Sequence, residues 1–169
     1  MFSKDNFEFY EIILDILETN EFKELKSITH HGNGMTRYDH SLRVAYYTYV
    51  ITKSLRLNCK KATRGALLHD FFFTSQTSEL TTTQALKLHP EYACENATKY
   101  FNISKLEEDI IKKHMFPITK VPPRYLESFI VNIIDNCASV YEKAYSTRMN
   151  LSTANAFLLI LLVNYIKII

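Results

Sequence analysis

Apolar residues along the chain recur at spacings of three and four, the pattern of helices that bury one face. Within residues 60–70, for example, the small residues Ala62, Gly65 and Ala66 stand at i, i+3 and i+4, and His69 falls on the same face at i+7. No extended alternation of period two occurs, and only three glycines and four prolines interrupt the sequence. The pattern predicts an all-α, compact helical bundle with helices at residues 6–18, 21–28, 37–56, 60–70, 90–101, 105–115, 123–145 and 152–167.

Two of the predicted helices have recognisable starts. Ser104 with Glu107 three residues later forms the pattern of a capping box. Pro90 suits the first turn of a helix and would place His89 at its N-cap. Before that helix, residues 71–89 are rich in Ser and Thr, which predicts a loop with a short helix. Such a loop could be a lid or a connector that covers the core.

Length and charge indicate one ordinary domain. We expect residues 1–169 to form a single domain with its core at about 30–145 and the last helix packed on it. The net charge is +2 and both signs are well mixed, so no basic block predicts a nucleic-acid or anionic membrane partner. The three cysteines are widely spaced and form no CxxC pair, which fits a reducing compartment.

Neither terminal segment has the pattern of a secreted or membrane protein. Residues 1–18 carry acids throughout and lack the pattern of a signal peptide. The apolar stretch AFLLILLVNYIKII has 14 residues and includes an Asn and a Lys, whereas a membrane span needs roughly 20 apolar residues. We therefore expect a cytoplasmic protein whose last helix is buried rather than a membrane anchor.

One titratable pair interrupts an apolar run, because His69 and Asp70 stand within GALLHDFFF. A buried carboxylate without a partner costs several kcal/mol, and a metal ion is the simplest partner. Taken singly, each such residue could be a hydrogen-bonded core or capping residue. Imidazole and carboxylate together suit iron, manganese, zinc and similar ions. Because no cysteine lies near these residues in the sequence, the pattern argues against a structural zinc site. Six residues at core-facing positions form the candidate metal site: His40, His69, Asp70, His89, His114 and Asp135.

The order of these residues resembles the H…HD…D signature of the HD-domain metal-dependent phosphohydrolase superfamily. The segments RYDHSLRVA, GALLHD, HPEYACENA, DIIKKHMFP and VNIIDN carry the resemblance, and the chain looks most like small single-domain bacterial members. The resemblance implies an HD-type helical fold that binds two divalent ions. Iron or manganese is the preferred identity of these ions, and zinc, nickel, cobalt and magnesium are further candidates. It also implies a first ion on His40, His69, Asp70 and Asp135, and a second on His89 and His114 with Asp70 bridging.

The same resemblance implies a hydrolase in which a metal-bridging hydroxide attacks a phosphate ester. The expected substrate is a nucleotide or another small phosphorylated metabolite. Its identity stays open, because specificity depends on the shape of the pocket rather than on the metal ligands.

A phosphate substrate also needs cationic side chains near the metal. Arg37 precedes His40 by three residues and shares its helical face, whereas Lys112 and Lys113 could equally be solvated charges. His31 stands beside a glycine and could contact the substrate or donate a proton, although a surface position explains it as well. The candidate catalytic residues are Asp70, His31 and Arg37, and the candidate substrate-binding residues are Arg37, Arg64, Lys112 and Lys113.

Two other classes of function stay open. Some HD proteins with the same six ligands bind two irons and activate oxygen, so a di-iron HD-type oxygenase is the first alternative. The second is a non-catalytic HD module that senses a ligand or binds a partner protein. The presence of all six ligands speaks against this module, because a degenerate scaffold has no need of them. A homo-oligomer is compatible with either class.

Overall fold

The structure of the chain, a computed structural model, describes residues 4–30 and 35–146. Its α-helices are α1 (Lys4–Leu17), α2 (Asn20–Glu24), α3 (Arg37–Ser54), α4 (Cys59–Leu68), α5 (Thr82–Tyr100), α6 (Lys105–Lys113) and α7 (Leu126–Ser146), with short 3-10 helices η1 (Leu25–Ser27) and η2 (Thr74–Gln76). Within these residues, β pairing is limited to an isolated bridge between Thr29 and Thr36. The all-α prediction is confirmed. The helix expected at 152–167 lies outside the described residues.

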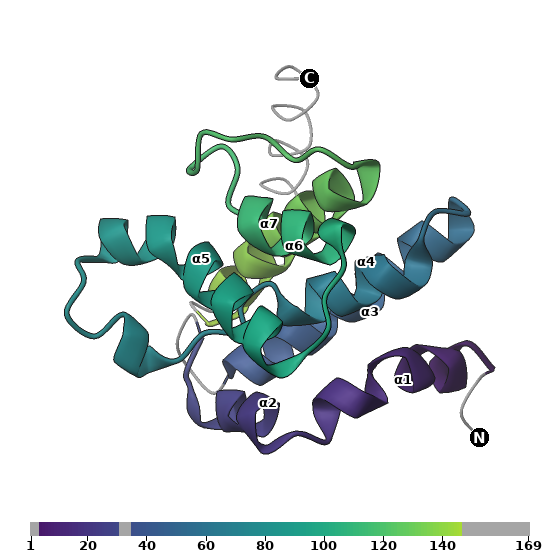
Figure 1. Ribbon diagram of the computed structural model, residues 1–169, viewed down its shortest axis with the longest axis horizontal. Coiled ribbons are helices and arrows are strands. Elements are labelled where there is room, and N and C mark those ends of the chain that lie inside the picture. Colours follow the sequence, from purple (N-terminus) through teal and green to yellow (C-terminus); the bar gives the residue numbers. More distant parts are fainter. Residues whose placement is uncertain (1–3, 31–34, 147–169) are drawn as a thin grey trace.

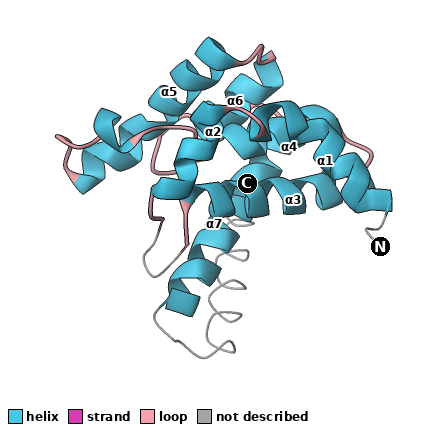
Figure 2. Cartoon of the chain, turned by 90° about the horizontal axis from the view of Figure 1, so that it is seen from below, coloured by secondary structure: helices cyan, strands magenta, loops and turns pink. Residues whose placement is uncertain are grey.

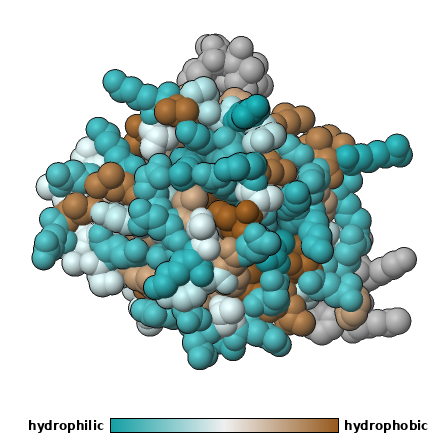
Figure 3. All heavy atoms as spheres, in the orientation of Figure 1, coloured by the Kyte–Doolittle hydropathy of each residue, from teal (hydrophilic) through white to brown (hydrophobic). Residues whose placement is uncertain are grey.

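Helices α3 and α4 pack against each other in the middle of the fold, and the other helices surround them (Figure 1). Helix α6 packs on α4, α7 on α3, and α5 on α6, while α1 lies along α4. Figure 2 shows the same described elements as helices joined by loops, the longest of which connect α4 to α5 and α6 to α7. The face seen in Figure 3 is mostly hydrophilic, with apolar side chains in small patches. Among the described residues, no helix combines the length and apolarity that a membrane crossing requires.

The small-residue face of α4 allows α6 to approach it closely. A Cβ atom added to Gly65 would lie 2.9 Å from Ile110 Cδ1 and 3.2 Å from Glu107 Cα. Ala62 and Ala66, on the same face of α4, are fully buried. This contact sets the C-terminal ends of α4 and α6 next to each other, and each of these helices ends at a histidine.

Helix α5 begins well before Pro90, so the prediction that Pro90 opens this helix was wrong. The start is a capping box in which Thr81 Oγ1 accepts from the Gln84 backbone N–H at 3.3 Å, and Gln84 Oε1 accepts from the Thr81 N–H at 2.9 Å. Pro90 therefore lies inside the helix, where it cannot donate the usual backbone hydrogen bond. His89 is an interior helical residue rather than an N-cap, and the predicted loop at 71–89 is correspondingly shorter.

Two buried asparagines hold the turns that follow α4 and α6. Asn96 on α5 donates to the carbonyl of Phe71 at 2.9 Å. Asn132 on α7 donates to the carbonyl of Phe116 at 2.8 Å and also to the carbonyl of His114. Because both turns are tied to a neighbouring helix, the histidines that end α4 and α6 are held in place.

Candidate metal centre

Five helices contribute to one buried cluster of histidines and aspartates. Helices α3, α5 and α7 each carry one member, α4 and α6 each carry one at the C-cap, and the sixth member, Asp70, directly follows the C-cap of α4. The six residues are between 0 and 7 % exposed, and they come from positions up to 95 residues apart in the chain. The structure thus brings all six predicted metal ligands together: His40, His69, Asp70, His89, His114 and Asp135.

The C-terminal ends of α4 and α6 favour positive charge at this cluster. The ring centroids of His69 and His114 lie 4.9 Å apart, because the two helices that end at these residues are in close contact. The end of a helix carries about half a negative charge from its unpaired carbonyl groups. Two such ends directed at one place stabilise a cation there.

The first group of ligand atoms surrounds Asp135. Its Oδ1 lies 3.0 Å from His40 Nε2 and 3.5 Å from His69 Nε2. These three residues, which we call the first group, come from α7, α3 and the end of α4, and all three are buried. Their ligand atoms lie within 4.8 Å of one another, a spacing that allows one ion to contact all three.

The second group consists of His89 and His114, with Asp70 beside them. Asp70 Oδ1 lies 3.2 Å from His89 Nε2 and 3.6 Å from His114 Nε2. The other carboxylate oxygen, Oδ2, lies 3.9 Å from Nε2 of His69 in the first group. Asp70 therefore lies between the two groups, with one oxygen toward each.

Backbone carbonyls orient three of the four imidazoles. Because a carbonyl can only accept a hydrogen bond, the Nδ1 atom that faces it must carry the proton. A ring that carries no second proton then directs the lone pair of Nε2 toward the cluster. The three contacts are His69 Nδ1 to Ala66 O at 2.7 Å, His89 Nδ1 to Ala85 O at 3.0 Å and His114 Nδ1 to Ile111 O at 2.7 Å.

Ionisation in the cluster follows from its burial and its close contacts. Burial alone lowers the pKa of His40, but hydrogen bonds to Asp135 and Glu142 outweigh it and raise this pKa to about 10. Burial and the neighbouring imidazoles lower the pKa of His114 to about 3, so this ring is neutral. Burial raises the pKa of Asp135 and of Asp70, but nearby imidazoles outweigh it and hold both pKa values below the usual range. Both carboxylates are therefore ionised, as metal ligands must be.

The cluster fits a divalent metal ion. His69 Nε2 and Asp70 Oδ1 are buried, yet neither makes a hydrogen bond to another described residue. A buried polar atom without a hydrogen bond costs about 1–3 kcal/mol, and a bond to a metal ion removes that cost. Another set of three residues, which takes members from both groups, also has its ligand atoms within 4.8 Å of one another: His69, Asp70 and His114. Imidazole and carboxylate oxygen are ligands that iron, manganese and zinc accept.

Arg37 is a buried cation beside the second group. Its Nη1 donates to the carbonyl of Phe72 at 2.6 Å, and its guanidinium lies 3.6 Å from the centre of the Phe72 ring. The same ring lies 4.9 Å from the ring of His89. Arg37 Nε is buried and makes no hydrogen bond to a described residue. Burial lowers the pKa of Arg37, and the charge of Asp70 opposes this shift.

The other predicted substrate-binding cations have partners elsewhere. Arg64 pairs with the two carboxylate oxygens of Asp15 at 2.5 and 2.9 Å and lies 3.4 Å from Glu107. It thus joins α1 to α4 and α6. Lys112 lies 3.4 Å from Glu91 on α5. A substrate-binding role would require both side chains to give up these ion pairs.

The predicted roles of two further residues, Lys113 and His31, are not tested by the structure. Lys113 is partly exposed at the end of α6, one residue before His114. His31, the candidate proton donor, lies outside the described residues. The structure therefore leaves the proposed contacts of both side chains with a substrate as predictions.

Two side chains at the cluster were not predicted. The ring of His30 lies 4.2 Å from that of His40, and its ligand atom lies within 4.8 Å of those of His40 and Asp70. Glu142 Oε2 lies 3.0 Å from His40 Nδ1. The sequence contains a signal for Glu142, since it follows Asp135 by two helical turns and so shares its face. No sequence signal distinguishes His30 from its neighbour in the chain.

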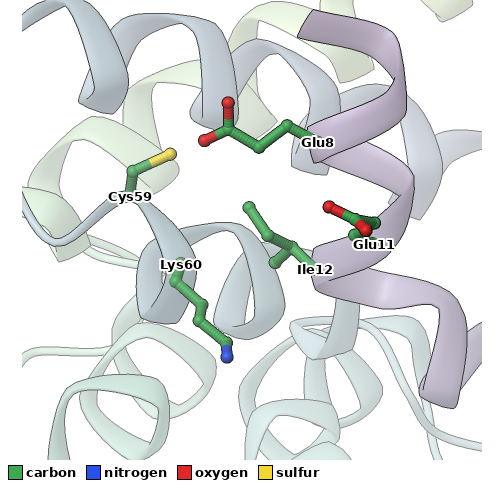
Figure 4. A pocket seen from close by; sticks show the side chains of 5 residues that line it. All are labelled: Glu8, Glu11, Ile12, Cys59 and Lys60. Atoms are coloured by element: carbon green, nitrogen blue, oxygen red, sulfur yellow. The ribbon is translucent and has the colours of Figure 1, made fainter. Parts of the chain in front are cut away.

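A separate surface pocket of about 390 Å³ lies between α1 and the start of α4 (Figure 4). Its lining residues are Glu8, Glu11, Ile12, Cys59 and Lys60. None of these belongs to the histidine and aspartate cluster. The pocket therefore lends no support to the chemistry of the candidate metal centre.

Comparison with known proteins gave one match. The model of the HD domain family matches residues 37–139, a range that contains all six residues of the cluster. A search of curated proteins and a search of solved structures found no match.

Proposed function

The chain belongs to the HD domain family, and on that premise we propose that it is a metal-dependent phosphohydrolase for a nucleotide or another small phosphorylated metabolite. HD domains are mostly metal-dependent hydrolases. The observation that carries the proposal is the placement of Asp70, whose Oδ2 faces His69 while its Oδ1 faces His89 and His114. A carboxylate with one oxygen toward each of two imidazole groups is arranged to bridge two ions.

In this proposal the first group would hold one divalent ion and the second group another, and Asp70 would be available to both. Bound divalent ions, iron or manganese in the first instance, supply Lewis acidity that lowers the pKa of water and polarises a phosphoryl oxygen. Asp70 and Asp135 offset part of the positive charge, because nearby imidazoles keep both carboxylates ionised. The backbone carbonyls behind His69, His89 and His114 keep these rings turned toward the ions.

Arg37 supplies the positive charge that a phosphate substrate needs beside the metal. Its guanidinium is held by the Phe72 carbonyl and ring, so it loses little side-chain freedom when it binds an anion. The buried Nε has no hydrogen bond within the described part of the chain and can donate to a phosphoryl oxygen. We assign His30, whose ring lies against His40 and whose ligand atom lies within 4.8 Å of those of His40 and Asp70, as the donor of a proton to the leaving oxygen.

The test compares the wild type with Asp70→Asn. We expect the purified wild type to contain divalent metal and to release phosphate from members of a nucleotide panel. Asp70→Asn should reduce both metal content and phosphate release, the latter by about 100-fold or more. Asp109→Asn is the control, because Asp109 accepts a backbone N–H from Arg124 and lies outside the cluster. It should keep both properties.

Three results would refute the hydrolase. In the first, Asp70→Asn keeps both its metal and its activity. In the second, the iron-loaded wild type consumes oxygen with a substrate and releases no phosphate, which indicates the di-iron oxygenase. In the third, the metal-loaded wild type releases no phosphate and consumes no oxygen, which indicates the non-catalytic module.

A further inference from the structure

Glu142 is a buried carboxylate that contacts a predicted metal ligand, His40, at the ring nitrogen opposite the one that faces Asp135. Its side chain is 0 % exposed, and Oε2 lies 3.0 Å from His40 Nδ1. The other oxygen, Oε1, accepts from Arg43 Nη1 at 2.5 Å. Arg43 lies on α3, nearly one turn after His40. Both carboxylate oxygens are therefore engaged, and Glu142 is not arranged to bind the ion itself.

His40 differs in this respect from the other three histidines of the cluster. Those three direct Nδ1 at a neutral carbonyl of their own helix, whereas Nδ1 of His40 faces an anion from α7. A carboxylate that accepts the Nδ1 proton fixes the tautomer and makes the opposite nitrogen a stronger donor to a metal. The two groups of the cluster are thus unequal, and the first group has the more basic ligand.

We propose that Glu142, held by Arg43, is a positioning residue for the ion in the first group. It keeps the proton of the neutral His40 ring on Nδ1 and directs the Nε2 lone pair at the ion. As a result, Glu142 strengthens the binding of the ion in the first group. This inference rests on the proposed function only in that it requires a metal ion at the cluster, and it does not depend on the substrate.

The chemistry of a Glu142→Gln variant makes the proposal testable. The Arg43 guanidinium can only donate, so it attracts the oxygen of the Gln amide. The amide NH₂ then faces His40 Nδ1 and donates to it, which moves the ring proton to Nε2. That proton blocks the nitrogen that should bind the metal. If Arg43 is replaced as well, the amide can turn its oxygen to Nδ1 and the metal-binding tautomer returns.

The experiment measures zinc affinity by chelator competition on the full chain after removal of metal. We expect Glu142→Gln to weaken the binding of one Zn²⁺, the ion of the first group, by about 10–100-fold. The double variant Arg43→Met with Glu142→Gln should regain part of this loss, a rescue that a purely structural ion pair would not produce. Glu107→Gln is the matched control, since Glu107 is also buried and paired with an arginine, and it should stay within twofold of wild type.

A second measurement uses the wild type alone and does not depend on how the variants fold. Nitrogen NMR of the zinc-loaded chain should show His40 bound through Nε2 and protonated at Nδ1. Zinc bound through Nδ1 would overturn the proposal, and so would a Glu142→Gln variant with wild-type zinc affinity. A wild type that takes up no zinc, manganese or iron would instead refute the metal centre on which the proposed function also rests.

Discussion

The Nε2 atoms of His89 and His114 face each other at 2.9 Å, while the Nδ1 atom of each ring faces a backbone carbonyl. Both carbonyls only accept, so a ring that carries a single proton holds it on Nδ1 and presents a lone pair at Nε2. Two lone pairs at this distance repel unless a proton or a metal ion lies between them. The fold therefore holds these two rings in an arrangement that favours a bound cation.

Divalent ions should stabilise the folded chain, and His114→Leu should remove part of that effect. An ion that binds only the folded state adds about 2.7 kcal/mol at a concentration of 100 times its Kd. The variant loses a ligand but also loses the opposed lone pairs, so its metal-free unfolding free energy should stay within about 1 kcal/mol of wild type. Thermal unfolding with Mn²⁺ and with EDTA measures both quantities. An equal Mn²⁺ effect in the two proteins would place the ion elsewhere.

Metal binding should release protons. Burial lowers the pKa of His40, but its hydrogen bonds to carboxylates raise it to about 10, so the metal-free ring is charged at neutral pH. A metal ion needs the neutral ring, so its apparent affinity should increase with pH up to about that value, about tenfold per pH unit for each proton displaced. Calorimetric titration at pH 7 in two buffers of different ionisation enthalpy gives the number released. If that number is zero, His40 is not a ligand.

Arg37→Lys should reduce catalysis without loss of metal. A lysine keeps the charge but cannot lie flat on the Phe72 ring or donate from a second nitrogen to a phosphoryl oxygen. We expect kcat/KM for phosphate release to decrease by about 10–100-fold, which corresponds to one or two hydrogen bonds to a charged group. The control is Arg124→Lys, at an exposed arginine outside the cluster. Unchanged kcat/KM in Arg37→Lys would remove Arg37 from the site.

Arg64→Met should reduce stability rather than activity. Arg64 pairs with Asp15 and lies 3.4 Å from the buried Glu107, and its own side chain is 16 % exposed. Loss of these ion pairs should lower the unfolding free energy by about 1–2 kcal/mol, because Glu107 would lose one of its partners. Urea titration measures this change, and kcat/KM of the metal-loaded variant should match wild type. A decrease in kcat/KM with full stability would support the substrate contact that the sequence predicted.

Gly65→Ala should weaken both the fold and the metal centre. The added methyl would lie 3.2 Å from the backbone of Glu107, so α4 and α6 must move apart, together with the histidines at their ends. We expect a net loss of about 1–2 kcal/mol in unfolding free energy despite the better helix propensity of alanine. Zinc affinity should decrease as well. Lys61→Ala, at an exposed position on α4, should change neither quantity.

Capping and proline signals in the sequence predicted the start of a helix correctly where a single signal was present. They failed where two signals competed for the same helix. The capping box at Ser104 predicted the start of α6, and the structure has that start. At α5 two signals compete, since Thr81 with Gln84 and Pro90 each fit a helix start. The earlier signal prevailed because its two side-chain hydrogen bonds form at the end of the helix, while Pro90 is tolerated inside it.

By itself, the sequence determined the helical class and the set of six buried histidines and aspartates. Both follow from residue type and helical spacing, which can be read within each segment of the sequence separately. Only the tertiary structure decided that Asp70 lies between two imidazole groups, that Glu142 contacts His40, and that Arg64 pairs with α1. Most of these contacts join residues that are 19 to 102 positions apart in the sequence. The contact between the neighbours His69 and Asp70 depends on the side-chain conformation of Asp70. All of them therefore form only when the helices pack together.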